Sequence, residues 1–188
     1  GFDYTHSSGL YLGNWNSSIA SDFFGVGGGA GIEMDFYGGY RSTIPNTTVG
    51  YDVGYLYYYY PGVADGGPTP DGPDNGELYL GLSYGNLSGK ISYSTTDYFG
   101  VKGDRNADTD GTLYYQAAYT YPVSDVLSLS AGLGHTDVAK SSALDYSDYF
   151  VGASYKFAGV DLGAKVISTS GKGVAGDLPV RNSRGRLE

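Results

Sequence analysis

The sequence predicts an all-β protein, an antiparallel up-and-down transmembrane β-barrel with about ten strands in this chain. The first indication is alternation, because apolar and polar residues follow each other at period two in a series of short segments. The second is a regular change between short and long connections, as in outer-membrane barrels. The third is composition. The 32 glycines and 21 tyrosines among 188 residues are unusual for a soluble domain and suit strands with aromatic girdles.

Five alternating segments occupy the first half of the chain. They cover residues 2–6, 10–15, 32–41, 49–58 and 77–84. In the third segment Ile32, Met34 and Phe36 fall on one face. Glu33 and Asp35 fall on the other. The fourth and fifth segments repeat this scheme with valine, tyrosine and leucine on the apolar side. Because successive side chains of a strand point to opposite faces, each segment is expected to present one apolar and one polar face.

Five further segments follow in the second half. They cover residues 87–94, 113–121, 127–134, 149–157 and 160–167. The two-residue turn Gly85-Asn86 leads into the first of them and requires an antiparallel pair. The expected short connections are 85–86, 122–126 and 158–159, and the expected long ones are 17–31, 61–76, 95–112 and 136–147. Short turns and long loops should therefore gather at opposite rims of the barrel.

The same alternation has a second interpretation, a soluble β-sandwich or an exposed repeat sheet. Period two alone does not say whether the apolar face meets lipid or protein. The charges on the opposite face of nearly every strand, together with the alternating loop lengths, favour the barrel. We expect a single β-barrel domain over residues 1–170, with 171–188 forming a loop and the start of a C-terminal segment.

Charge and residue usage exclude several classes of function. The net charge is -9, and the eleven Lys and Arg residues form no basic stripe, so we expect no nucleic-acid partner. The absence of cysteine excludes a disulfide framework and a thiol nucleophile. His6 and His135 belong to no nucleophile motif, so we expect no enzyme. No apolar run approaches the roughly 20 residues of a membrane helix, so any crossing of a membrane would use strands.

Several stretches resemble the TorF-like porins, a proteobacterial outer-membrane family. They are residues 1–11 (GFDYTHSSGLY), 33–40 (EMDFYGGY), 50–54 (GYDVG) and 77–84 (ELYLGLSY). The resemblance implies a porin-like barrel and supplies no substrate and no catalytic residue. Members of that family are longer at both ends. The resemblance therefore implies that this chain lacks the first and last strands of a barrel with about twelve, an even number as in bacterial single-chain barrels.

Nine charged residues at polar positions of the strands are candidates for lining a pore. They are Glu33, Asp35, Arg41, Asp52, Glu77, Lys90, Lys156, Asp161 and Lys165. The acids cluster in the first half of the chain and the lysines in the second, which would set a transverse field across a pore if both sets face inward. The alternative is a plugged lumen in which these groups pair with one another, because small barrels are often filled by their own side chains.

One acidic loop has oxygen ligands at alternate positions, as a calcium loop does. The candidate ligands are Asp104, Asn106, Asp108 and Asp110. The glycine of this loop comes two places later than in the EF-hand pattern, and the distal glutamate is missing. An ordinary acidic surface loop is the alternative, and no other cofactor is expected.

The expected function is that of an outer-membrane porin that passes or binds small solutes or ions, with outer-membrane lipid as its other partner. The alternative is an extracellular structural fibre. Strands rich in tyrosine and glycine with unpaired edges offer a template for edge-to-edge stacking. Self-association, and metal binding through the acidic loops, would belong to this alternative.

Overall fold

A computed structural model describes residues 1–19, 31–63 and 72–170. These residues form one sheet of ten strands in the order β1 to β10, so that each strand pairs with its neighbours in the sequence. Every pair is antiparallel. The predicted all-β, up-and-down antiparallel arrangement is therefore confirmed.

The elements follow one another with few interruptions. The strands are β1 (Phe2–Thr5), β2 (Leu10–Ser18), β3 (Ile32–Thr43), β4 (Val49–Tyr59), β5 (Asn75–Tyr84), β6 (Leu87–Ser94), β7 (Leu113–Pro122), β8 (Leu127–Asp137), β9 (Tyr146–Phe157) and β10 (Val160–Thr169). Three short 3₁₀ turns lie in the connections, namely η1 (Tyr98–Gly100), η2 (Asp104–Asn106) and η3 (Ser142–Leu144). No helix among the described residues is long and apolar enough to cross a membrane.

All ten predicted segments are strands, and several extend further than the alternation indicates. β2 continues to Ser18 because its polar end pairs with Ile32 at the start of β3. β8 and β9 likewise continue past their apolar positions, with Thr136 opposite Tyr146. The cause is backbone pairing with the neighbouring strand, which needs no apolar side chain. These extensions lie at the end of the sheet where the long connections are found.

The connections alternate in length as predicted. The short ones are residues 6–9, 44–48, 85–86, 123–126 and 158–159, and they lie at one end of the sheet. The long ones at the other end include residues 95–112 and 138–145. The expected loops 17–31 and 61–76 and the segment 171–188 fall partly or wholly outside the described residues.

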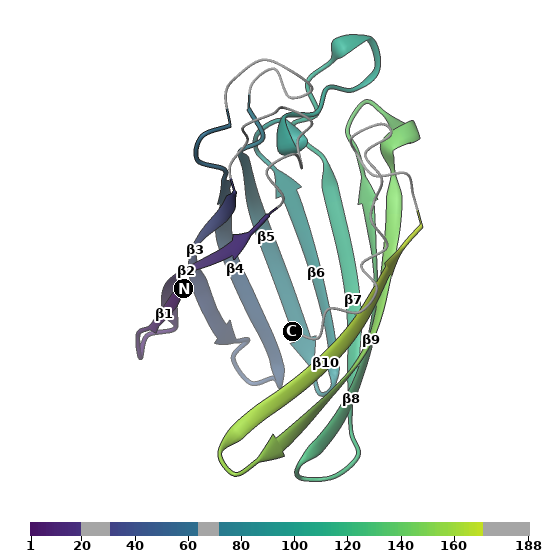
Figure 1. Cartoon of the computed structure of the whole chain (residues 1–188). Coiled ribbons are helices and arrows are strands. Elements are labelled where there is room, and N and C mark those ends of the chain that lie inside the picture. The colour runs from purple at the N-terminus through teal and green to yellow at the C-terminus, as the bar shows by residue number, and fades with distance from the viewer. Residues whose placement is uncertain (20–30, 64–71, 171–188) are drawn as a thin grey trace.

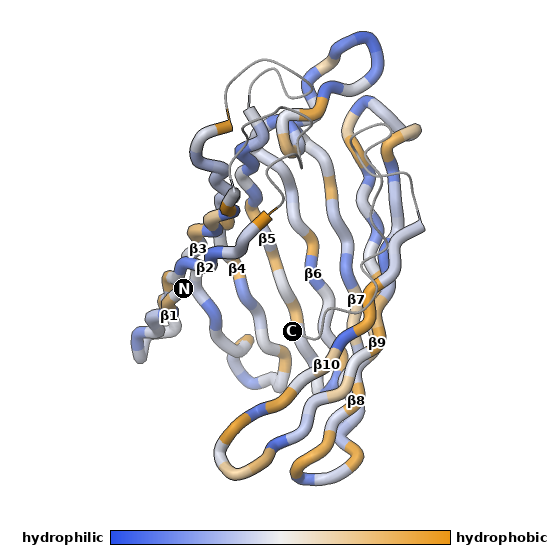
Figure 2. The backbone as a smooth tube through the Cα atoms, in the orientation of Figure 1, coloured by the Kyte–Doolittle hydropathy of each residue, from blue (hydrophilic) through white to orange (hydrophobic). Residues whose placement is uncertain are grey.

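The sheet has an apolar face that no other described part of the chain covers. Leu78, Leu80 and Leu82 on β5 keep 46–52% of their surface exposed, and Figure 2 shows apolar and polar positions alternating along the strands. The buried hydrophobic side chains of the described residues are only Tyr11, Tyr60, Tyr98 and Val138. A β-sandwich would bury this face against a second sheet, whereas the described residues form a single sheet.

The sheet curls but does not close. Figure 1 shows the strands sweeping round from β1 to β10 so that one face becomes concave. Such coiling follows from the right-handed twist of β-strands. β1 and β10 each have one neighbour within the described residues and are not paired with each other. The prediction of a closed barrel is therefore not met in this part of the chain.

Candidate functional site

The nine charged residues proposed to line a pore all share one face of the sheet. Residues paired directly across two strands point to the same side, and Arg41 pairs with Asp52, which pairs in turn with Gly81. The same rows continue to Lys90 on β6 and, through the later strands, to Lys165 on β10. We call this side the polar face. That it lines a pore stays a prediction.

Side-chain contacts across several strands show that the polar face is the concave one. The Tyr37 hydroxyl on β3 donates a hydrogen bond of 2.5 Å to Asp3 on β1, which is separated from β3 by β2. The hydroxyls of Tyr11 on β2 and Tyr79 on β5 are hydrogen-bonded to each other. Strands lie about 4.8 Å apart, so side chains from β2 and β5 meet only where the sheet bends toward them.

Two cations lie over the joined tyrosines. The Arg41 guanidinium lies 4.0 Å from the centre of the Tyr11 ring, and the Lys90 ammonium lies 4.8 Å from the centre of the Tyr79 ring. Tyr11 also donates a hydrogen bond to Asp52. We call these five side chains the tyrosine cluster. Each cation is attracted by the negative face of its ring, so the cluster holds two positive charges in place on the concave wall.

Two glycines make room for the tyrosine cluster. A Cβ atom on Gly39 would lie 2.6 Å from the Tyr11 hydroxyl oxygen and 2.5 Å from the Val53 carbonyl oxygen. A Cβ atom on Gly54 would lie 2.6 Å from the Gly38 carbonyl oxygen and would press against the Tyr79 hydroxyl. Gly39 and Gly54 are paired across β3 and β4. The absence of side chains at Gly39 and Gly54 therefore leaves room for the Tyr11 and Tyr79 rings next to the backbone.

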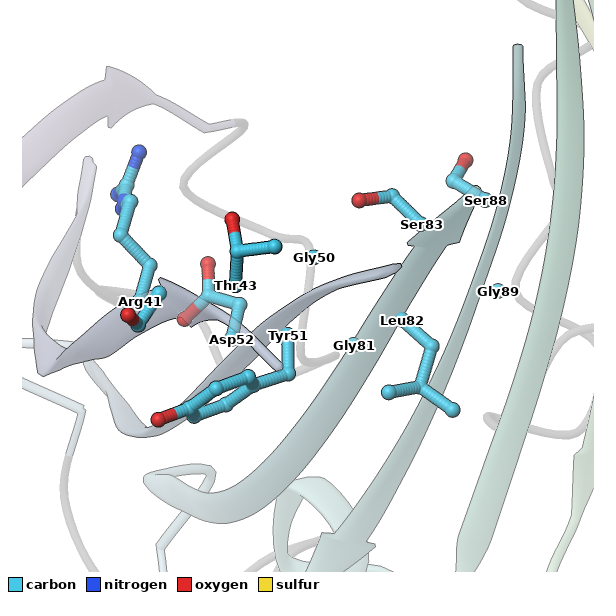
Figure 3. Close-up of a pocket in the computed structure, with 11 residues that line it drawn as sticks. Arg41, Thr43, Gly50, Tyr51, Asp52, Gly81, Leu82, Ser83, Ser88 and Gly89 are labelled. Carbon is cyan, nitrogen blue, oxygen red and sulfur yellow. The ribbon is translucent and has the colours of Figure 1, made fainter. Parts of the chain in front are cut away.

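A hollow of about 480 Å³ opens beside the tyrosine cluster, on the side of the short turns. In Figure 3 Arg41, Thr43 and Asp52 stand on one side of it and Ser83 and Ser88 on the other. Glycines at positions 50 and 81 leave the space between them free of side chains. These two charged groups and three hydroxyls thus border an open hollow that Tyr51 and Leu82 also line.

The acidic and basic residues of the polar face lie at different distances from the short turns. The basic residues Arg41, Lys90, Lys156 and Lys165 each lie within six positions of a short turn. The acidic residues eight or more positions away are Glu33, Asp35, Glu77 and Asp148. Asp3, Asp52 and Asp161 lie near the short turns as well. The end of the concave face near the long loops is consequently acidic, and the other end is mixed.

Three of the four acids near the long loops, Glu33, Glu77 and Asp148, accept hydrogen bonds from neutral donors. The Tyr60 hydroxyl donates to Glu33 at 2.6 Å, and the Asn75 amide donates to Glu77 at 3.1 Å. The Tyr114 hydroxyl donates to Asp148 at 3.3 Å. Hydrogen bonds from neutral groups leave the charge of a carboxylate uncompensated.

The three predicted pore-lining residues on β9 and β10 are exposed. Lys156 and Asp161 are directly paired across β9 and β10, and Lys165 lies 4.7 Å from the centre of the Phe150 ring. All three side chains are open to solvent. The structure thus gathers Arg41, Asp52 and Lys90 into one cluster, while Lys156, Asp161 and Lys165 form a separate group at the far end of the sheet.

The proposed calcium ligands do not converge. Asp104 accepts a hydrogen bond from Ser141, and Asp108 forms an ion pair of 2.8 Å with Lys102. Asp110 lies 3.5 Å from Lys140, and Asn106 is exposed. No group of three or more histidine or acidic side chains in the described part of the chain could hold a metal ion. The carboxylates of this loop bind different protein partners, and calcium binding there stays a prediction.

Sequence reasoning missed the tyrosines of the polar face. It assigned the many tyrosines to girdles at the membrane interface, yet Tyr11, Tyr79 and Tyr114 lie on the concave wall and bind charged residues. The sequence did place Tyr79 on the polar face, because it stands two positions after Glu77 in the same alternating segment. Tyrosine at polar positions was therefore the sign of a hydrogen-bonded wall.

A bacterial family matches almost the whole chain. Its description is "Bacterial protein of unknown function (Gcw_chp)", and the match covers residues 1–182. The chain belongs to this Gcw_chp family. The resemblance of this Gcw_chp chain to the TorF-like porins stays a prediction.

The comparison with solved structures also gives a match. A solved porin structure resembles this Gcw_chp chain with a TM-score of 0.43 and 16% sequence identity, over 96% of this chain and 56% of the porin. The chain thus covers little more than half the length of that porin. No curated protein matches the Gcw_chp chain.

Proposed function

We propose that this Gcw_chp protein is an outer-membrane β-barrel of the TorF-like porin type that passes or binds small polar solutes. The observation that carries the proposal is the opposition of the two faces. Leucine, valine and tyrosine side chains stand exposed on the outside of the curl, and charged groups and hydroxyls line the inside. Soluble monomers rarely expose so continuous an apolar surface, whereas lipid-facing strands alternate in this way.

The connections and the backbone support the same assignment. Short turns at one end and long loops at the other are the arrangement of bacterial outer-membrane barrels. Within lipid every backbone polar group needs a partner. The proposed barrel therefore requires hydrogen-bond partners for the outer edges of β1 and β10 when it is in the membrane.

Solutes would meet the tyrosine cluster and the hollow beside it. Arg41 and Asp52 offer opposite charges at the edge of this space, and Thr43, Ser83 and Ser88 offer hydroxyls. A wall that combines both charges with hydroxyls binds polar molecules through several weak contacts. Such weak contacts at more than one place favour passage over tight capture.

The test is electrical recording from purified protein in planar bilayers. Discrete conductance steps are expected, and the double variant Arg41→Gln/Lys90→Gln should shift ion preference toward cations because it removes two positive charges from the wall. Lys140→Gln is the control, since Lys140 lies in the β8–β9 connection outside the strands. A well-folded protein that stays electrically silent would contradict the pore. An unchanged ion preference in the double variant would remove these two residues from its lining.

A second candidate function rests on the free edge of the sheet. All ten residues of β10 are exposed, and β10 pairs only with β9 in the described part of the chain. An open strand edge of this length is a template for adding a second copy. Negative-stain microscopy of the secreted fraction separates the two functions, because long ordered fibres are expected only from edge-to-edge stacking.

A further inference from the structure

The connection between β6 and β7, residues 95–112, folds back against the sheet at its long-loop end. Figure 1 shows it rising above the strands near the other long connections. Tyr98 is only 6% exposed, and Thr109 and Thr112 are fully or almost fully buried. Buried residues are uncommon in surface loops, since loops usually run over the outside of a protein. We call this segment the β6–β7 loop.

Two neighbouring residues of the β6–β7 loop contact opposite parts of the concave face. The Phe99 ring lies 5.1 Å from the ring of Tyr58 on β4. The Tyr98 hydroxyl lies 2.8 Å from the hydroxyl of Tyr146 on β9. Both partners belong to the polar face, because Tyr58 pairs with Asp35 and Tyr146 with Thr136. Tyr98 and Phe99 therefore bridge the concave side from β4 to β9.

Hydrogen bonds hold the β6–β7 loop in this position. The Thr109 backbone N–H donates to the Asp97 carboxylate at 2.6 Å, and the Tyr98 N–H donates to the Thr109 hydroxyl at 2.9 Å. Lys102 donates to the same Asp97 carboxylate. The Ser141 hydroxyl, in the β8–β9 connection, donates to Asp104 at 2.9 Å. The loop is thus tied to itself and to its neighbour.

The backbone at Phe99 gives an independent sign that its contacts determine its position. Phe99 has φ of 48°, in the left-handed region that favours glycine. A non-glycine residue is disfavoured in this region and persists only where the surroundings enforce it. The Phe99 ring also lies 4.9 Å from the Tyr98 ring and 6.3 Å from the Tyr60 ring. Packing of the ring outweighs the backbone preference.

We propose that Tyr98 and Phe99 form a fixed filter that limits the size of the solutes admitted at the long-loop end of the concave face. The filter rests on the proposed pore function and deepens it, because it assigns the size limit to two residues. Aromatic rings packed across a passage narrow it without adding charge. Small solutes such as pentoses would pass beside them, and oligosaccharides would be held back.

The test compares two double variants in liposomes that swell as sugars enter. Tyr98→Ala/Phe99→Gly removes both rings, and glycine at 99 accepts the positive φ without strain. Tyr98→Phe/Phe99→Tyr keeps both rings and is the matched control. The rate for raffinose relative to arabinose should rise at least about threefold in the ring-deleted variant and stay unchanged in the control. Folding of each variant is checked on gels, where an unheated, folded barrel migrates differently from a heated sample. If the double variant does not fold, the single variant Phe99→Gly takes its place in the comparison.

The outcomes separate the filter from the pore. An unchanged ratio in the ring-deleted variant, with arabinose entering normally, would overturn the filter and leave the pore standing. If neither the native protein nor the variant admits arabinose although both are folded, the pore and the filter both fall. Entry of arabinose only after removal of the rings would overturn a filter that admits pentoses, because the rings would then close the passage instead of limiting solute size.

Discussion

At the scale of single residues, bare backbone at Gly39 and Gly54 allows charged and aromatic side chains to meet on the concave wall. Tyr11 reaches over Gly39, and Tyr79 reaches over Gly54. Glycine within a strand often marks such a close approach. The tyrosine cluster thus depends on two positions that themselves carry no side chain.

Gly54→Val should therefore destabilise the fold. Its side chain would overlap the Gly38 carbonyl and the Tyr79 hydroxyl, and overpacking of this kind costs about 1–3 kcal/mol. Urea unfolding of the detergent-solubilised protein would measure the loss. Gly81→Ala is the matched control, because a Cβ atom there has its nearest neighbour at 3.6 Å. Equal unfolding midpoints for the two variants would show that the rings move aside freely.

At the scale of elements, the β6–β7 loop is held in part by the two ion pairs of Lys102. Lys102 lies between Asp97 and Asp108. Its hydrogen bond lowers the pKa of Asp108 below the usual value for an aspartate, with Lys140 adding to the effect. A carboxyl whose pKa is depressed in the folded state stabilises that state above the unfolded pKa, about 3.9. The stabilisation is lost as the pH falls through the folded value.

Asp108→Asn should consequently loosen the β6–β7 loop at neutral pH but not in acid. Hydrogen exchange of the backbone amides of residues 97–110 would measure this, with faster exchange expected in the variant at pH 7. At a pH well below the depressed pKa of Asp108 the two proteins should exchange alike, after correction for the intrinsic rates, because Asp108 is then protonated in the native chain. A difference of the same size at both pH values would mean that the charge of Asp108 is not what holds the loop.

At the scale of the whole molecule, the single curled sheet leaves its apolar side exposed. Leu80, in the middle of β5, is 46% exposed on that side. In a bilayer its neighbours would be lipid chains. In water the same position would be an ordinary surface site, where substitutions change stability by roughly 0.5 kcal/mol or less. One substitution can therefore report which solvent surrounds the sheet.

Leu80→Arg should destabilise the protein in lipid by about 2–4 kcal/mol, the cost of an arginine at the middle of a bilayer. Gln116→Arg is the control, because Gln116 on β7 belongs to the polar face. Reversible unfolding from liposomes would give both values. A small, equal effect of the two substitutions would favour a water-exposed sheet and with it the fibre.

Much of this architecture could be predicted without coordinates, because the period of two is local. All ten strands and the alternation of short and long connections follow from neighbours in the sequence. That Glu33, Asp35 and Arg41 share one face follows in the same way, since successive side chains of a strand point to opposite faces. The ends of β2, β8 and β9 could not be placed, because polar residues there are held only by pairing with another strand.

The local sequence pattern alone thus determines the strands, their apolar and polar faces, and which charged residues belong to the polar face. Only the tertiary structure decided the contacts between strands that are not neighbours, because the curvature of the sheet brings their residues together. Tyr11 meets Tyr79 across two intervening strands, and the β6–β7 loop reaches from β4 to β9. Such contacts depend on how far the whole sheet bends, a property summed over many residues that no single segment of the sequence carries.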